Sequence, residues 1–112
     1  MMTRTEAPDD VVLVYTTAAS LVEAETIGAD LVERRLAACV NILPHMRSLY
    51  RWNGVVERAD EVVMIVKTVR RLVEPARQRF REAHSYDTPA LLVIEAPGGD
   101  PDYIAWLRAE TA

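Results

Sequence analysis

A long β-hairpin in the middle of the chain constrains the fold more than any other stretch of the sequence. Two runs rich in apolar, β-branched and aromatic residues extend from Cys39 to Lys67, and Asn53-Gly54 separates them. An Asn-Gly pair in this setting predicts a two-residue type I′ turn, because both central residues of that turn need a positive φ. Glycine adopts such a φ freely and asparagine tolerates it, so we expect two long antiparallel strands joined at this point.

The turn also fixes which residues of the two strands face each other. Trp52 is expected opposite Val55, and Tyr50 opposite Glu57. Further along the strands, Arg47 is expected opposite Asp60. Opposite charges in a cross-strand pair of this kind contribute ~0.2–1 kcal/mol.

The strands of this hairpin are too long for a compact domain of 112 residues. The segment from Cys39 to Trp52 would span roughly 47 Å at ~3.4 Å per residue, whereas a domain of this length has a diameter of roughly 35 Å. We therefore expect the hairpin to bend, to project, or to do both. Pro44 lacks an N–H and suits a β-bulge, so it is the predicted bend. Apolar side chains beyond it would remain uncovered and indicate an interaction surface. The alternative is a bent hairpin packed wholly on its own helices.

The segments on either side of the hairpin supply the remaining elements. Residues 11–17 predict a buried strand, and Ser20-Leu21-Val22-Glu23 is a capping box that opens an amphipathic helix. Pro75 fits the first turn of a second helix, which should end near His84. Residues 90–96 predict another strand of the buried type. A proline at the first helical position then predicts a short C-terminal helix.

This order, β-α-β-β-α-β followed by a short helix, indicates an α+β fold with the ferredoxin-like split βαβ arrangement. The first residues are polar and include Pro8, so we expect a flexible N-terminal arm over residues 1–9. The rest of the chain, residues 10–112, should form a single domain.

Charge and cysteine content exclude several classes of protein. The formal net charge is −4 and the basic residues form no long run, which argues against a nucleic-acid partner. No apolar run approaches the ~18–20 residues that cross a bilayer, so we expect no membrane partner. The start of the chain lacks the apolar core of a signal peptide. Cys39 is the only cysteine, so no intrachain disulfide can form, and a cytoplasmic location is the simplest expectation.

Three side chains outside the turn could carry chemistry. His84 ends a predicted helix beside Tyr86 and could bind a divalent cation or move a proton, although a helix C-cap histidine is the alternative. Lys67, the only lysine, could bind an anion or cap a strand end. Cys39 could be reactive, but a buried free cysteine is usually inert. Trp52 is better explained as a packing or interface anchor than as a substrate platform.

The sequence contains neither a zinc-binding motif nor a glycine-rich loop that would bind a phosphate group. His45 follows Pro44 at the predicted bend of the hairpin. The sequence has no HxH, HExxH or CxxC spacing, which argues against a preformed tetrahedral zinc site. The segment after the first strand, Thr17-Ala18-Ala19-Ser20, contains no glycine, which argues against a dinucleotide-binding loop.

Several ordered blocks of the sequence resemble the CutA family of divalent-cation tolerance proteins. They are Ala37-Ala38-Cys39-Val40-Asn41-Ile42, Ser48-Leu49-Tyr50-Arg51-Trp52-Asn53-Gly54, Lys67-Thr68, His84-Ser85-Tyr86-Asp87-Thr88-Pro89 and Asp102-Tyr103-Ile104-Ala105-Trp106. The resemblance runs from about Val11 to Leu107. It implies a small cytoplasmic homotrimer of ferredoxin-like subunits, akin to PII signalling proteins, in which the hairpins of adjacent subunits pair. It also implies a link to tolerance of copper and other divalent metals.

The resemblance implies a ligand-binding cleft between subunits as well. The side chains that would line it here are Cys39, Trp52, Lys67, His84 and Tyr86. Two departures bear on copper: some bacterial members have a cysteine at the position of Tyr15, and some have a His-His pair where this chain has Ala83-His84. A strong copper site is therefore not carried over to this chain.

The leading functional prediction is a non-enzymatic, trimeric binding or regulatory protein with a role in the response to divalent metal ions. No cofactor is expected to be obligatory; Cu(II) or another divalent cation, or a small anion, would bind weakly, with His84 as the metal ligand. One alternative is an enzyme that uses Lys67, His84 and Tyr86. The other is a purely structural trimeric scaffold. Clustering of Lys67 and His84 around one pocket would favour an enzyme or ligand site, and their dispersal would favour the scaffold.

Overall fold

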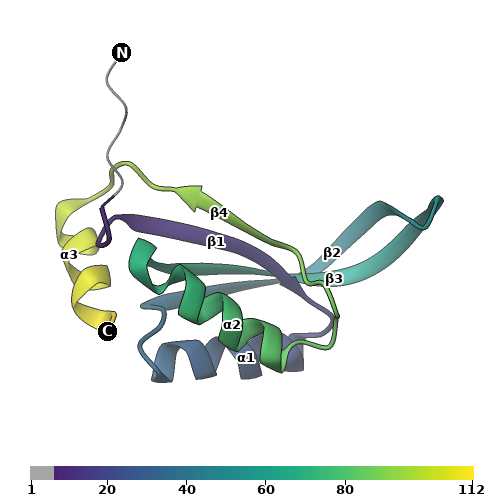
Figure 1. The fold of residues 1–112 in the computed structure, drawn as a ribbon, viewed down its shortest axis with the longest axis horizontal. Helices are drawn as coiled ribbons and strands as arrows, with labels where there is room; N and C mark the ends of the chain where they lie inside the picture. The colour runs from purple at the N-terminus through teal and green to yellow at the C-terminus, as the bar shows by residue number, and fades with distance from the viewer. Residues whose placement is uncertain (1–6) are drawn as a thin grey trace, which may run out of the picture.

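The computed structural model describes residues 7–112 as one antiparallel sheet with helices packed on it (Figure 1). The elements in chain order are β1 (Val11–Ala18), α1 (Leu21–Glu33), β2 (Cys39–Trp52), β3 (Val55–Val69), the 3-10 turn η1 (Arg70–Leu72), α2 (Val73–Ala83), β4 (Leu91–Glu95) and α3 (Pro101–Glu110). The strand order in the sheet is β2-β3-β1-β4. The predicted α+β class and ferredoxin-like split βαβ order are confirmed.

Helices α1 and α2 cover one face of the sheet, while α3 lies at the end of the sheet where β1 begins (Figure 1). The main core forms between that covered face and the two helices. It includes Val14 and Met64 from the strands, Leu31 from α1 and Phe80 from α2, all with almost no exposed surface. Of the other face, the described helices cover only the end where α3 packs near Lys67, and this leaves apolar side chains of the sheet such as Leu43 and Leu92 in contact with solvent.

The capping pattern at α1 forms largely as the sequence predicts. Ser20 is the N-cap, and its hydroxyl accepts a hydrogen bond from the Glu23 amide at 3.1 Å. The Glu23 carboxylate accepts in return from the Ala19 amide at 2.8 Å, one residue before the cap. Further along α1, Gly28 lies against β2: a Cβ at this position would meet Val40 Cγ1 at 3.3 Å. Glycine thus allows the helix to approach the sheet closely.

The hairpin has the predicted turn and the predicted register. Asn53 and Gly54 have φ values of 51° and 80°, as a type I′ turn requires. Trp52 pairs with Val55, Tyr50 with Glu57 and Arg47 with Asp60. The charges of the last pair meet at 3.0 Å, between Arg47 Nε and Asp60 Oδ1, on an exposed surface where such a pair contributes little.

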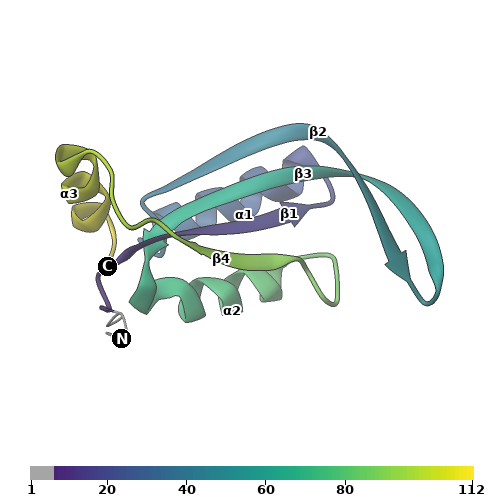
Figure 2. The same cartoon turned by 90° about the horizontal axis from the view of Figure 1, so that it is seen from above.

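The hairpin both bends and projects. The register shifts between Leu43 and Met46, which places a bulge at Pro44 and at His45, whose φ is 70°. Beyond the bulge the two strands curve away from the rest of the sheet (Figure 2). The molecule therefore measures 42 × 39 × 24 Å, with a radius of gyration of 15.1 Å, above the ~13 Å of a compact domain of this size.

Replacing Gly54 by valine should destabilise the protein. A β-branched residue at φ 80° is strained, and such strain costs about 1–3 kcal/mol. Thermal and urea denaturation of Gly54→Val would show the loss. Gly98→Val is the matched control, because a Cβ there meets no atom within 4 Å and its φ is not positive. Equal stability of the two variants would contradict the role assigned to the turn.

Strand β4 differs from its prediction. Residues 90–96 read as a strand buried on both faces, but β4 lies at the edge of the sheet and is mostly exposed within one chain. Leu92 is 65% exposed, Val93 43% and Ile94 48%. The expectation of burial is wrong for the single chain because, among residues 7–112, α1 and α2 cover only one face of the sheet and no strand pairs with the outer edge of β4.

Two residues of the predicted N-terminal arm make contacts with the rest of the domain. Residues 1–6, most of the predicted arm, lie outside the described residues. Pro8 and Asp9 are held by the folded domain: the Pro8 carbonyl accepts from the Arg71 amide at 2.9 Å, and the Asp9 carbonyl accepts from Arg108 Nε at 3.0 Å. Arg71 Nε also donates to the Asp9 carboxylate at 2.9 Å.

Candidate functional site

An open groove of ≈ 760 Å³ lies where the hairpin bends away from the sheet. One wall is the face of β2 that carries Met46, Ser48, Tyr50 and Trp52. The floor comes from β1 and β3, and the loop after α2 forms the opposite wall. The other residues that line the groove are Tyr15, Thr17, Leu49, Glu61, Tyr86, Asp87, Thr88 and Ala90. Its volume is typical of small-molecule sites, which occupy about 300–1,000 Å³.

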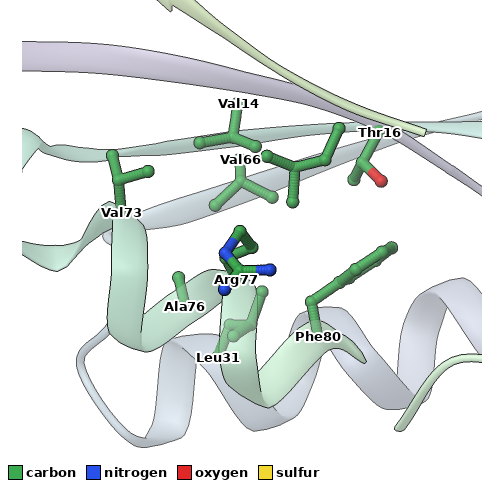
Figure 3. A pocket seen from close by; sticks show the side chains of 9 residues that line it. Val14, Thr16, Leu31, Val66, Val73, Ala76, Arg77 and Phe80 are labelled. Carbon is green, nitrogen blue, oxygen red and sulfur yellow. The ribbon is translucent and has the colours of Figure 1, made fainter. Parts of the chain in front are cut away.

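The interior of the domain offers no comparable space. A cavity of ≈ 10 Å³ lies between the covered face of the sheet and α2, lined mainly by apolar side chains such as Val14, Val66 and Phe80 (Figure 3). That volume is about one water-sized probe. The groove on the uncovered side of the sheet is therefore the better candidate for a ligand site.

Polar groups on the groove floor are held by direct hydrogen bonds. The Thr17 hydroxyl donates to the Glu61 carboxylate at 3.0 Å, which fixes a partly buried negative charge beside Tyr86. Burial, followed by the nearby negative charges of Glu61 and Glu23, raises the pKa of Tyr86 above its ordinary value of 10.0. The Tyr86 phenol therefore stays neutral at physiological pH and can donate or accept a hydrogen bond.

His84 lies beneath the wall of the groove rather than inside it. Its side chain has no exposed surface, and its ring is 4.7 Å from the rings of both Phe80 and Tyr86, measured between centroids. Nε2 lies 2.7 Å from the Thr17 carbonyl oxygen, and Nδ1 accepts from the Tyr86 amide at 2.9 Å. This pattern fixes the neutral tautomer with the proton on Nε2. Both ring nitrogens are engaged, as in the C-cap alternative, and His84 is indeed the C-cap of α2.

Glu23 ties the start of α1 to the loop that carries Tyr86. Its Oε2 accepts from the Ala19 amide at 2.8 Å, its Oε1 accepts from the Ser85 amide at 2.6 Å, and Oε1 lies 4.0 Å from His84 Nδ1. Burial opposes ionisation, but the hydrogen bonds from the Ala19 and Ser85 amides lower the pKa of Glu23 below its ordinary 4.5. The ionised carboxylate thus holds the groove loop in place.

Glu23→Gln should lose stability in a pH-dependent way. Because the folded pKa of Glu23 lies below 4.5, its charge stabilises the fold above that pH and ceases to do so as the pH falls through the folded pKa. The difference in the free energy of unfolding between wild type and Glu23→Gln should be about 1–2 kcal/mol near neutrality and shrink in acid. Urea denaturation over a pH series measures it, with Glu25→Gln as an exposed control on the same helix. A pH-independent difference would contradict this role.

Lys67 and Cys39 lie at the other end of the sheet. They are paired in register, and Lys67 Nζ donates to the Tyr103 hydroxyl of α3 at 3.0 Å. That hydrogen bond raises the pKa of Lys67 above its ordinary 10.5, while partial burial acts in the opposite direction. Lys67 is opposite Leu13 on β1, four residues from Thr17, or about 13 Å along the strand. Within one chain the predicted cleft residues therefore form two groups.

The structure brings together part of the predicted set and adds residues that sequence reasoning missed. Trp52 and Tyr86 share the groove, with His84 directly beneath it, while Cys39 and Lys67 lie apart. Glu61 was missed, although the hairpin register places it on the same face as Glu57, four pairs further from the turn. His45 is exposed at the bulge and lines a smaller depression of ≈ 460 Å³ on the other side of the hairpin.

Residues 7–112 contain neither a cluster of metal-ligating side chains nor a helix that could span a membrane. No three side chains among histidine, cysteine, aspartate and glutamate lie close enough together to hold a metal ion. None of the three helices combines the length and apolarity needed to cross a bilayer.

Comparisons with known proteins agree on one family. The model of the CutA1 divalent ion tolerance protein family matches residues 12–110. The divalent-cation tolerance protein CutA of Pectobacterium atrosepticum is 42% identical over 89% of this chain and 91% of its own length. The chloroplastic protein CutA of Arabidopsis thaliana is 34% identical over 89% of this chain and 55% of its own length. The crystal structure of CutA from Xylella fastidiosa superimposes with a TM-score of 0.90 at 37% identity, covering 92% of this chain and 99% of that one. The chain belongs to the CutA1 divalent ion tolerance protein family.

Proposed function

We propose that the protein acts as a non-enzymatic homotrimer in the response to divalent metal ions, with weak ligand binding at grooves between subunits. The observation that carries this proposal is the uncovered apolar face of the sheet. Its side chains alternate with those of the helix-covered core and come from all four strands: Leu13, Tyr15, Leu43, Val63, Ile65, Leu92 and Ile94. An apolar face of this extent supports burial against other subunits.

Several features support self-association in particular. Among the described strands β4 is an edge strand, with exposed Leu92 and Ile94, and the projecting hairpin presents exposed Tyr50 and Trp52. An open sheet edge and a protruding hairpin on the same molecule can satisfy each other between identical chains. The resemblance to the CutA family also implies a trimer.

Metal binding forms the second part of the proposal. His84 Nδ1 and Glu23 Oε1 are 4.0 Å apart, a separation that a cation with ligand bonds of about 2.0–2.2 Å can bridge. To bind there, the cation would displace the Tyr86 and Ser85 amides that now donate to those atoms. Two ligands and the loss of two hydrogen bonds indicate modest affinity, and imidazole favours Cu(II) among common divalent ions.

Within one chain Lys67 and His84 are dispersed, which favours the scaffold alternative over a site that uses both residues and argues against the enzyme alternative. An acid, a base and an anion-binding group must reach the same reacting atoms, and within one chain Lys67 and His84 lie at different ends of β1.

The cellular location is a separate part of the proposal. The single cysteine favours a reducing compartment, and we propose the cytoplasm. Among the relatives, the Arabidopsis protein is named as chloroplastic.

Equilibrium sedimentation tests the assembly. We expect a species near three times the 12.6 kDa chain mass at micromolar concentration, because the uncovered sheet face and hairpin are too apolar to remain in solvent. Measurement in high salt should leave the mass unchanged, since apolar burial is not screened by ions. A monomer at that concentration would reject the proposal.

A further inference from the structure

We propose that opposite charges on the two faces of the projecting hairpin specify how identical copies of this chain meet. The basic face of one hairpin packs against the acidic face of the next copy and covers the groove beside it. The inference deepens the proposed function and rests on its homotrimer, for which it names the contact surfaces. Figure 2 shows the hairpin standing away from the rest of the sheet, so other copies can reach both of its faces.

The face of the hairpin toward the groove is acidic. Successive residues of a strand point to opposite faces, and directly paired residues of two strands share a face. Glu57 pairs with Tyr50 of the groove wall. Glu61 pairs with Met46 and itself lines the groove, to which the loop after α2 adds Asp87. Among the described residues, no lysine, arginine or histidine lines the groove, so this surface attracts a cation from outside the subunit.

The opposite face of the hairpin is basic. Arg51 pairs with Val56 on this face, and Arg58 follows two residues further along β3. Both arginines are exposed, and among the described residues neither has a carboxylate within ion-pair distance. Arg47 lies on the same face but already pairs with Asp60 at 3.0 Å. Two arginines therefore remain to attract carboxylates of another copy.

Coverage of the groove by another copy makes a countercharge necessary. Glu61 is already partly buried and accepts a hydrogen bond from the Thr17 hydroxyl at 3.0 Å. If only apolar surface closed over the groove, this carboxylate would lose its remaining water without gaining a cation, which is unfavourable. Because the described part of its own chain adds no basic side chain to the lining, the neutralising group comes from the copy that covers the groove.

Arginine side chains match the acidic face chemically as well as in charge. A guanidinium group can pair with a carboxylate through two parallel hydrogen bonds, and it also stacks on aromatic rings. The face that carries Glu57 also carries Tyr50 and Trp52, both exposed in the single chain. An arginine-bearing face can therefore contact the carboxylates and the aromatic rings of the neighbouring hairpin together.

The placement of the charges favours a ring over a two-fold dimer. The two faces of one hairpin point in opposite directions, so they cannot both lie in a single two-fold interface. A two-fold contact between acidic faces would bring like charges together, whereas a head-to-tail contact joins opposite charges in every copy. Three such contacts close the proposed trimer. Apolar burial supplies the affinity and the charges decide the orientation, so the assembled mass is still expected to be independent of salt.

Charge reversal on each face tests the inference in the full chain. The double variant Glu57→Arg/Glu61→Arg carries positive charge on both faces of the hairpin. The double variant Arg51→Glu/Arg58→Glu carries negative charge on both. Each should sediment near one chain mass at a micromolar concentration where wild type sediments near three. The fourfold variant that combines all these substitutions exchanges the charges of the two faces and should return to three chain masses. Its net charge equals that of wild type, so recovery reports the match between the faces.

Glu25→Arg/Glu33→Arg is the matched control, because both residues are exposed on α1, and it should keep the wild-type mass. Far-ultraviolet circular dichroism of every sample separates loss of assembly from loss of the fold. The Arg51→Glu/Arg58→Glu variant changes only exposed side chains of the hairpin, so it tests the inference even if replacement of Glu61 prevents folding. A folded variant of this kind that remains trimeric, or a folded fourfold variant that remains monomeric, would overturn the inference. A monomeric wild type would instead reject the proposed homotrimer, so the two failures are distinguishable.

Discussion

A glutamate in place of Leu92 should convert the assembled protein to monomers. Leu92 is the most exposed apolar residue of β4, at 65%, and pairs with Tyr15 on the uncovered face of the sheet. If that face is buried between subunits, the new carboxylate would lose its water without gaining a partner. The cost of an unpaired buried charge is on the order of several kcal/mol, and a symmetric trimer incurs it at every interface.

The expected measurement is a fall in sedimentation mass from about three chains to one, with the far-ultraviolet circular dichroism spectrum retained. Val22→Glu is the matched control: Val22 is 75% exposed in the first turn of α1, where a negative charge suits the helix dipole. That variant should keep the wild-type mass. An unchanged mass for Leu92→Glu would show that β4 does not take part in assembly.

The hairpin shows how much of this fold local sequence rules can predict. The turn at Asn53-Gly54 depends on the φ preferences of two residues, and the register then follows by counting, so Arg47 meets Asp60 as expected. The bend was predictable too, because a proline in a long strand interrupts the ladder. Here it is the following residue, His45, that takes the positive φ.

The burial of β4 could not be predicted in the same way. An apolar run such as Leu91–Glu95 has the same composition whether the second face is covered by a helix or by another chain. Sequence periodicity reports that both faces avoid water, but it does not identify what covers them. The error for the single chain is therefore itself information about assembly.

The candidate site was only partly predictable because its parts come from distant segments. Tyr86 and Trp52 line the same groove from segments more than 30 residues apart, and the Thr17 hydroxyl donates to Glu61, 44 residues further along the chain. The pairing of Lys67 with Tyr103 depends on where α3 packs, which no local pattern specifies. The sequence thus indicated the residue types of the site, while tertiary packing decided which of them meet.

His84→Ala should lower the free energy of unfolding by about 2–4 kcal/mol. The substitution removes a buried ring between Phe80 and Tyr86 and leaves the Thr17 carbonyl and the Tyr86 amide without their partner. Urea denaturation measures this loss. His45→Asn is the control, because the other histidine is exposed at the bulge and asparagine tolerates its positive φ.

The same pair of variants tests the metal proposal by titration with Cu(II) near neutral pH. If His84 is a ligand, wild type and His45→Asn bind alike, and His84→Ala binds more weakly. Each sample is titrated in the temperature range where denaturation shows it folded, so lost binding cannot reflect unfolding. If the isotherms of wild type and His84→Ala coincide, His84 serves only to connect the loop after α2 to β1 through its hydrogen bonds, and the metal ligand lies elsewhere.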